Sequence, residues 1–290
     1  MIRILGLGDN VVDKYIYKNV MYPGGNAVNV AVYAVFLGAE AGYLGIFGDD
    51  REGCVVRRAL EEKGIDQSRC RTVHGENGYS AVDLVDGDRT YVGGNDGGIS
   101  KTEPLVLSGE DFAYLKRFDW IHTSCYSHID SQLPYIKSVG VPISYDFSNH
   151  FGKESCAAVC PHIDAALISC GHLDDAEIDD AARMAQRAGC RMVVTSMGQR
   201  GARVYFRGKT YQQPALLVQA KDTLGAGDSF FAGFIVSYLS GGGRLDAAEG
   251  QDVLIKQSLL KAAAFASKIC MIDGAFGCGA PIKEENGNLG

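Results

Sequence analysis

The sequence predicts an α/β fold in which a central, mostly parallel sheet is covered by helices on both faces. Short apolar runs of strand length alternate along the chain with longer stretches of helical character. Most of these apolar runs end at polar or glycine-containing residues, as expected where a strand gives way to a loop. The stretch 71–98 departs from this alternation and predicts a small β insertion beside the main sheet.

Two strand and helix pairs are predicted in the first part of the chain. The first strand covers residues 2–7, and the first helix, which Gly38 closes, covers residues 28–37. The second strand covers residues 41–47, and the second helix covers residues 52 to about 63. The later elements are the strands at residues 120–122, 143–145, 165–168 and 192–194, with helices at residues 175–188 and 228–239.

The β insertion is predicted from two segments with alternating or turn-rich sequences, residues 14–22 and 71–98. Within the second segment, Asp86-Gly87 stands between strand-forming residues, which is a hairpin signal. We expect the two segments to form a small sheet beside the main body of a single domain that covers residues 1–290.

The composition excludes several classes of partner. A formal net charge of -7 argues against binding to nucleic acid or to an anionic membrane, both of which require a basic face. No apolar run approaches the ~20 residues of a membrane helix, and the N-terminus lacks a signal-peptide pattern.

The nine cysteines include no CxxC pair, so neither zinc nor disulfides are expected, and reduced thiols indicate the cytoplasm.

The strongest chemical motif lies at residues 222–230, where Gly225-Ala226-Gly227 precedes Asp228 and an apolar helix. Small residues at a helix N-terminus allow backbone N–H groups to converge on an anion. A carboxylate just inside that terminus is placed to accept a hydroxyl proton beside a bound phosphate. The alternative is that Asp228 only caps the helix.

This motif resembles the DTxGAGD signature of the ribokinase, or PfkB-type, carbohydrate kinase family. A second block, GGNAVNVA at residues 24–31, is similar to the GGN-type block of the same family, and the resemblance extends over essentially the whole chain. It implies a ribokinase-like three-layer sandwich with a small β lid at residues 14–22 and 71–98. It also implies that the lid covers a sugar or glycated-amine substrate and joins two copies in a homodimer.

The resemblance assigns roles to individual residues. Asp228 is expected to take the proton from the sugar hydroxyl, while the backbone amides of Gly225, Ala226 and Gly227 hold the transferred phosphoryl group. ATP and Mg²⁺ are the expected cofactors.

Two further sets of residues are carried over from the same resemblance. Thr195, Gly198 and Gly201 match the nucleotide-binding turn of the family. Asp222 and Gly274 match a site for a monovalent cation, usually K⁺.

The sugar is expected to meet polar residues and glycines near the first strand. These are Asp9, Asp13, Gly24, Gly25, Asn26 and Asn29, with Asn10 beside them. Carboxylates and amides suit hydrogen bonds to sugar hydroxyls, and glycines allow a close approach of the backbone. The alternatives are that Asn26 caps a helix and that Asp13 is a solvated turn residue.

The chain departs from the family at the N-x-x-E motif, which helps to organise Mg²⁺ and phosphates. The corresponding stretch is Ser169-Cys170-Gly171-His172, which has neither the amide nor the carboxylate. Either Asp174 or Asp175 substitutes, or the nucleotide itself holds most of the metal.

The finer resemblance is to fructoselysine 6-kinases, and it rests on residues 8–13, 24–33 and 145–148. It implies transfer of the γ-phosphoryl group of ATP to a primary hydroxyl, the 6-OH, of a fructosyl-amine. A fructokinase, or a ribokinase-like kinase of a free sugar or nucleoside, is the alternative within the family.

Other classes of protein fit less well. A dinucleotide-dependent oxidoreductase would need a third glycine where Val11 stands, after Gly6 and Gly8, and no P-loop is present. A non-catalytic sugar-binding regulator would explain the loss of the N-x-x-E motif, but it would not need Asp228.

Overall fold

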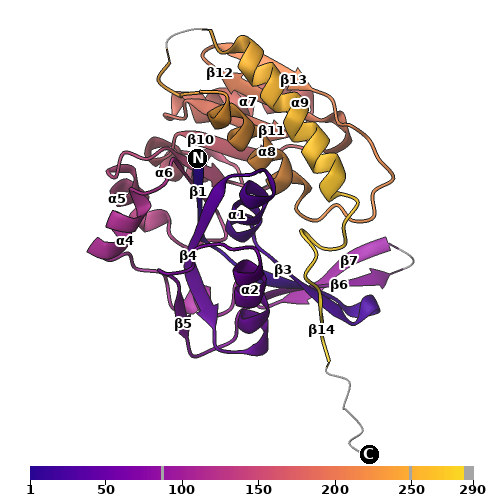
Figure 1. Cartoon of the computed structure of the whole chain (residues 1–290). Coiled ribbons are helices and arrows are strands. Elements are labelled where there is room, and N and C mark those ends of the chain that lie inside the picture. Colours follow the sequence, from indigo (N-terminus) through magenta and orange to yellow (C-terminus); the bar gives the residue numbers. More distant parts are fainter. Residues whose placement is uncertain (86–87, 248–249, 284–290) are drawn as a thin grey trace, which may run out of the picture.

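The computed structural model describes residues 1–85, 88–247 and 250–283, and a nine-stranded sheet forms its centre (Figure 1). In spatial order its strands are β13 (Lys209–Gln213), β12 (Ala202–Phe206), β11 (Met192–Ser196), β10 (Ala165–Ser169), β9 (Ile143–Asp146), β8 (Trp120–Ser124), β1 (Arg3–Gly8), β4 (Glu40–Gly48) and β5 (Arg71–Val73). Neighbouring strands from β11 to β5 pair in parallel, while β12 and β13 are antiparallel to the strands beside them. The predicted central, mostly parallel sheet is therefore confirmed.

Helices cover both faces of this sheet. They are α1 (Asn26–Phe36), α2 (Arg51–Glu62), α3 (Ile99–Thr102), α4 (Gly109–Leu115), α5 (Leu133–Lys137), α6 (Lys153–Val159), α7 (Asp175–Arg187), α8 (Ala226–Ser240) and α9 (Asp252–Ile269). Short 3₁₀ segments are η1 (Ile16–Lys18), η2 (Asp130–Gln132), η3 (Cys160–His162) and η4 (Gly198–Arg200). Among the described residues, no helix is both long enough and apolar enough to cross a membrane.

Two separate hydrophobic cores lie on opposite faces of the sheet, because successive side chains of a strand point to opposite sides. In β1, Ile4 belongs to the core under α1, α2, α8 and α9, whereas Leu5 and Leu7 belong to the core under α4 to α7. The three layers of the predicted sandwich follow from this alternation (Figure 1). All nine cysteine thiols are free, and four of them lie in the second core, namely Cys156, Cys160, Cys170 and Cys190.

Gly6 brings the start of α1 directly against β1. A Cβ atom at this position would lie only 2.1 Å from the carbonyl oxygen of Ala27. The glycine is therefore required for helix and strand packing, not for a dinucleotide motif. This contact places the first turn of α1 beside Asp9, which follows β1 and accepts a hydrogen bond from the Ala27 backbone N–H at 3.3 Å.

A second, five-stranded sheet projects from the main body at the lower right of Figure 1. In order it contains β14 (Ala280–Pro281), β3 (Val20–Gly24), β2 (Val11–Tyr15), β6 (Gly78–Val85) and β7 (Asp88–Gly94). The chain passes from β1 into β2 with only Asp9 and Asn10 between them, so these residues lie where the two sheets separate.

The small sheet differs from its predicted extent. Strand β2 begins before residue 14, β3 ends after residue 22, and β14 adds a strand that was not predicted. Residues 71–73 form β5 at the edge of the main sheet, because they pair in parallel with Ile46 to Gly48 of β4. The predicted turn at Asp86-Gly87 lies outside the described residues. The roles of the small sheet as a lid and as a homodimer contact stay predictions.

Candidate active site

The loop before α8 has a backbone conformation that only glycine adopts readily. Gly225 is the N-cap of α8 and has φ of 71°, in the left-handed region. A Cβ atom there would lie 2.4 Å from the hydroxyl oxygen of Tyr33. The helix therefore begins at Ala226, and its first N–H groups are directed out of its end. Of the three predicted anion-binding amides, that of Ala226 donates to the Thr223 carbonyl at 3.2 Å.

Asp228 lies in the first turn of α8 and is only 8% exposed. Its Oδ2 accepts a hydrogen bond from Nδ2 of Asn29 at 2.7 Å. No side chain caps this helix, so the interpretation of Asp228 as a helix cap is wrong. Burial raises the pKa of Asp228 well above its usual value, and the nearby Asp146 carboxylate raises it further. A buried carboxyl group with a raised pKa is suited to accept a proton near neutral pH.

The N-terminus of α8, residues 225–228, separates two cavities. Ala226 and Gly227 line one cavity of about 440 Å³. Gly225 and Asp228 line the other, of about 400 Å³. A helix N-terminus and a buried carboxylate thus stand between two spaces that each have the size of a small ligand.

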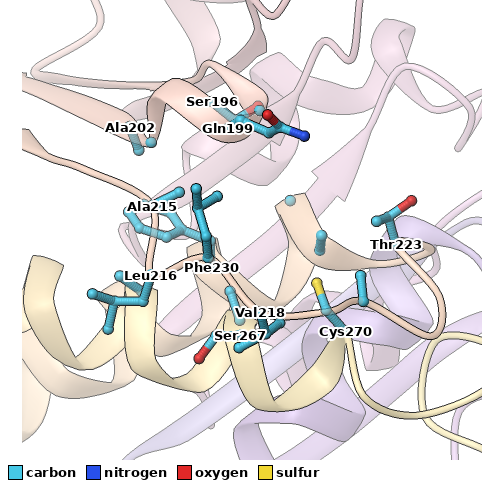
Figure 2. A pocket seen from close by; sticks show the side chains of 18 of the residues that line it. Ser196, Gln199, Ala202, Ala215, Leu216, Val218, Thr223, Phe230, Ser267 and Cys270 are labelled. Carbon is cyan, nitrogen blue, oxygen red and sulfur yellow. The ribbon is translucent and has the colours of Figure 1, made fainter.

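The first cavity is largely apolar, and its described lining residues include no charged side chain. Figure 2 shows Phe230, Leu216 and Val218 among the side chains around it. Part of this wall comes from residues 214–218 and from α9, neither of which was predicted to have a role. An apolar slot beside a helix N-terminus is suited to a flat ring that carries an anionic group.

Two of the three predicted nucleotide-turn residues line this first cavity. Gly198 has φ of 58° and Gly201 has φ of 95°. A Cβ atom on Gly201 would lie 2.0 Å from the Gln213 carbonyl oxygen. Thr195 does not line the cavity: its side chain is buried in β11, and the next residue, Ser196, takes its place on the wall.

The second cavity is acidic. It is lined by Asp9, Asn10, Val11, Asp13, Gly25, Asn26, Asn29, Tyr79, Ser80, Tyr91, Asp96, Gly97, Ser100, Tyr126, His128, Leu224, Gly225 and Asp228. Four of these residues are aspartates, and none of the described lining residues is lysine or arginine. Such a cavity attracts a ligand that carries positive charge as well as hydroxyl groups.

Strand β2 contributes one carboxylate, that of Asp13, to the wall of the acidic cavity. Asp13 is 7% exposed, so the interpretation as a solvated turn residue is wrong. Burial, together with the charge of Asp222, raises the pKa of Asp13 to about 7. Gly24 does not line the cavity but makes room for Asp13, since a Cβ atom there would lie 2.7 Å from Asp13 Oδ2.

Two buried amide oxygens in the acidic cavity have no hydrogen-bond partner within the described part of the chain. They are Oδ1 of Asn10 and Oδ1 of Asn29. The Nδ2 groups of both residues are engaged, that of Asn29 with Asp228 and that of Asn10 with Tyr43 at 2.9 Å. A buried acceptor left without a donor is costly, so these oxygens are suited to accept ligand hydroxyl groups.

Asp9 is fixed in place by two serines that follow or end β8. Its Oδ1 accepts hydrogen bonds from Ser124 Oγ at 2.8 Å and from Ser127 Oγ at 2.9 Å. Neither serine stands in a distinctive sequence pattern, and neither was predicted as a site residue. Asp9 still lines the acidic cavity, where Gly25 keeps the space beside its carboxylate open.

Asp146, the last residue of β9, was also missed as a site residue. Asn26 donates from Nδ2 to Asp146 Oδ2 at 2.6 Å and is the first helical residue of α1, not its cap. Burial raises the pKa of Asp146, and the charge of Asp9 adds to this effect. A carboxylate that ends a parallel strand could have indicated this position, because ligands bind at that edge of such sheets.

Asp222 and Gly274, the two residues predicted to hold a monovalent cation, are in direct contact through a hydrogen bond. Oδ2 of Asp222 accepts from the Gly274 N–H at 3.0 Å and from the Tyr15 hydroxyl at 2.6 Å, and Oδ1 accepts from the Leu224 N–H at 3.0 Å. Tyr15 belongs to β2, two residues after Asp13, so this contact ties the second sheet to the loop before α8.

The carboxylates considered as replacements for the N-x-x-E motif are engaged elsewhere. Asp174 caps α7 by accepting from the Glu177 N–H at 2.9 Å. Asp175 pairs with Arg203 at 2.9 Å and with Arg200 at 3.3 Å. In the described ranges, no group of three or more His, Cys, Asp or Glu side chains is arranged to hold a metal ion.

The chain is similar in sequence to known carbohydrate kinases. Residues 6–140 and 146–272 match the family described as pfkB family carbohydrate kinase. The chain is 37% identical to fructosamine kinase FrlD of Bacillus subtilis (strain 168), with 98% of this chain and 96% of that protein covered. It is 31% identical to fructoselysine 6-kinase of Escherichia coli (strain K12), with 93% and 98% covered.

Solved structures agree on the fold. Ribokinase of Arabidopsis thaliana, in complex with ribose and ATP, has a TM-score of 0.78 to this structure at 21% identity, and 96% of this chain and 95% of that chain are covered. Aminoimidazole riboside kinase of Salmonella enterica, in complex with aminoimidazole riboside and an ATP analogue, has a TM-score of 0.74 at 21% identity, with 95% and 96% covered. The predicted ribokinase-like fold is therefore confirmed.

Proposed function

The chain belongs to the pfkB family of carbohydrate kinases, and from this premise we propose that it transfers the γ-phosphoryl group of ATP to the 6-hydroxyl of a fructosyl-amine such as fructoselysine. Family membership confirms the prediction of a carbohydrate kinase and argues against a sugar-binding regulator. The single observation that carries the proposal is the N-terminus of α8 at residues 225–228, which has a buried carboxylate on one side and a nucleotide-sized cavity on the other.

In the proposed reaction, ATP occupies the apolar cavity with its phosphates at the N-terminus of α8. The sugar occupies the acidic cavity with its 6-hydroxyl at Asp228. The hydroxyl proton passes to the Asp228 carboxylate as the 6-oxygen bonds to the γ-phosphorus, and the bond from that phosphorus to the bridging oxygen of ADP breaks. The N–H groups of Gly225 and Gly227 and the helix dipole stabilise the negative charge on the phosphoryl oxygens.

The charge of the acidic cavity favours a fructosyl-amine over a free sugar. A neutral ketose would need hydroxyl partners but no surplus of carboxylates. Asp9 and Asp13 both line the cavity, and none of its described lining residues is a lysine or arginine. The secondary ammonium of a fructosyl-amine supplies the missing positive charge and forms charge-assisted hydrogen bonds. Both kinases reported above as relatives in sequence are named for such substrates.

Mg²⁺ supplies charge neutralisation on the phosphates when it is bound, and we expect the nucleotide to carry it because the described residues offer no ready cluster of ligands. The Asp222 carboxylate accepts hydrogen bonds from Tyr15, Leu224 and Gly274, and its part in a K⁺ site stays a prediction. No step of the proposed mechanism runs through K⁺, whose requirement stays a prediction.

The proposed substrate class is tested by measuring kcat/KM for fructoselysine and for fructose side by side. Because the loss of a charge-assisted hydrogen bond costs roughly 1.5–3 kcal/mol, fructoselysine is expected to be better by about 10- to 100-fold. An equal or higher kcat/KM for fructose would reject the fructosyl-amine and leave a kinase of free sugars.

The raised pKa of Asp13 predicts that the ionised carboxylate destabilises the folded protein near neutral pH. The pKa is about 7 in the folded protein, against 3.8 for an unperturbed carboxyl, so the folded state binds this proton more tightly. The free energy of unfolding therefore falls by roughly 4 kcal/mol for this group as pH rises from about 4 to about 7.

Asp13→Asn is accordingly expected to raise Tm at pH 8 but to change it little at pH 4, while it raises KM for the sugar. Thermal unfolding at both pH values measures the difference, with Asp180→Asn on the exposed face of α7 as a control. A Tm gain of the same size at both pH values would show that ionised Asp13 does not destabilise the fold.

A further inference from the structure

The acidic cavity has a second group of polar residues at its mouth, away from Asp228. Asp96 and Gly97 come from the turn between β7 and α3, and His128 comes from the loop between β8 and η2. The side chains of Asp96 and His128 are exposed, as expected at the entrance of a cavity. The proposed reaction uses none of these residues.

The mouth of the cavity carries both acidic and basic side chains, whereas the charged side chains deeper in the cavity are all aspartates. Asp96 Oδ2 forms an ion pair with Nζ of Lys101, the next ionisable residue along the chain. The imidazole of His128 stands close by, since a Cβ atom on Gly97 would lie 3.3 Å from its Nε2. The pKa of the Asp96 carboxyl is lowered mainly by its hydrogen bond with Lys101, and also by the charge of His128. We call Asp96, Lys101 and His128 the mouth cluster.

Two tyrosines of the cavity wall leave aromatic surface exposed. Tyr91 of β7 is 65% exposed and Tyr126, after β8, is 41% exposed, although both line the cavity. An aromatic face at the edge of a polar cavity is suited to pack against methylene groups of a ligand. A ligand that reaches from Asp228 to the mouth cluster therefore needs a hydroxyl end, an apolar arm and a charged end.

Resting on the proposed function, we propose that the mouth cluster binds the free amino-acid head group of a substrate glycated on its side-chain amine. The α-ammonium pairs with the Asp96 carboxylate, and the α-carboxylate pairs with the Lys101 ammonium and the His128 imidazole. The methylene arm lies against Tyr91 and Tyr126. One anionic and two basic side chains match this zwitterion, whereas the carboxylates deeper in the cavity match only the secondary ammonium.

This assignment narrows the substrate to free glycated lysine or a similar amino acid. A glycated lysine within a peptide has lost both its free α-amino and its free α-carboxylate group. Such a substrate keeps the fructosyl-amine but offers the mouth cluster no charged partner. The mouth cluster thus discriminates between substrates that are identical at the reacting hydroxyl.

The experiment compares three substrates on the full-length enzyme: fructoselysine, its Nα-acetyl amide, and fructosyl-butylamine. The wild type is expected to show a kcat/KM about 10- to 100-fold higher for fructoselysine than for the other two, since charge-assisted contacts are worth roughly that factor. The difference should appear in KM and not in kcat, because the reacting hydroxyl is the same in all three. Lys101→Met and Asp96→Asn should each remove most of the preference, and the losses should be much smaller with fructosyl-butylamine.

Lys116→Met is the matched control, because Lys116 is exposed at the end of α4 and does not line the cavity. This variant is expected to keep the wild-type ratio of kcat/KM between fructoselysine and the other two substrates. Equal kcat/KM for fructoselysine and fructosyl-butylamine in the wild type would overturn the inference, and so would variants of the mouth cluster that keep the full preference. If fructose instead surpasses both glycated amines, the proposed function fails, which is a distinct outcome.

Discussion

Asp228→Asn is expected to lower kcat by ~10²–10⁴-fold, the usual effect of removing a general base. Asparagine has nearly the same shape and can still meet Asn29, whose Nδ2 now bonds Asp228 Oδ2 at 2.7 Å. It cannot accept the hydroxyl proton. The substitution also removes a buried carboxylate whose pKa is raised by burial, so the variant is expected to be at least as stable as the wild type.

The measurement for Asp228→Asn is steady-state turnover with thermal unfolding and ATP affinity recorded on the same preparation. ATP affinity should stay close to that of the wild type, because the nucleotide cavity is lined by Ala226 and Gly227 and not by Asp228. Asp13→Asn provides a useful comparison, since it removes another buried carboxylate but is expected to act on KM for the sugar. Turnover of Asp228→Asn within a few-fold of the wild type would show that another group accepts the proton.

Gly225→Ala is expected to lower kcat/KM by about 10²–10³-fold, the loss seen when a donor to a developing negative charge is displaced. The added Cβ would lie 2.4 Å from the hydroxyl oxygen of Tyr33. That side chain is fully buried and donates to the Ala275 carbonyl at 2.5 Å, so it cannot simply turn away. The loop must move instead, and the amides at the start of α8 move with it.

Gly208→Ala is a matched control for Gly225→Ala. Gly208 has φ of 72°, against 71° for Gly225, and a Cβ atom there would meet nothing within 4 Å. Both variants carry the backbone cost of a non-glycine residue in the left-handed region, roughly 1 kcal/mol. Only Gly225→Ala adds a collision beside the site. Equal activity losses in the two variants would mean that general destabilisation, and not the position of the loop, lowers the rate.

Much of the fold could be predicted from the sequence because its signals are local. The apolar runs at residues 2–7 and 41–47 match β1 and β4 to within one or two residues, and strands buried on both faces are apolar throughout. The small sheet was harder to delimit. Residues 71–73 gave no sign that they pair with β4 in the main sheet, since pairing between distant segments depends on tertiary context.

The candidate site was predictable where a motif is continuous in the sequence. Gly225 and Asp228 lie together in the chain, and Asp13 and Asn29 lie near the conspicuous Gly24-Gly25 pair. Other residues reach the site only through folding, from separate strand ends or loops. Ser124 and Ser127 have ordinary neighbours in the sequence, and residues 145–148 gave Asp146 a family resemblance but no role. The contacts of all three appear only once β8 pairs with β1 and β9 pairs with β8.

The central claim is that the enzyme places phosphate on the 6-oxygen of a fructosyl-amine, and the most direct test is the identity of the product. Fructoselysine, ATP and Mg²⁺ are incubated with the enzyme, and the purified product is examined by ³¹P and ¹³C NMR. The account predicts one new phosphate monoester whose phosphorus is coupled to C6 of the sugar, with one ADP released for each molecule formed. A phosphate coupled to any other sugar carbon, or ADP released without a sugar phosphate, would contradict it.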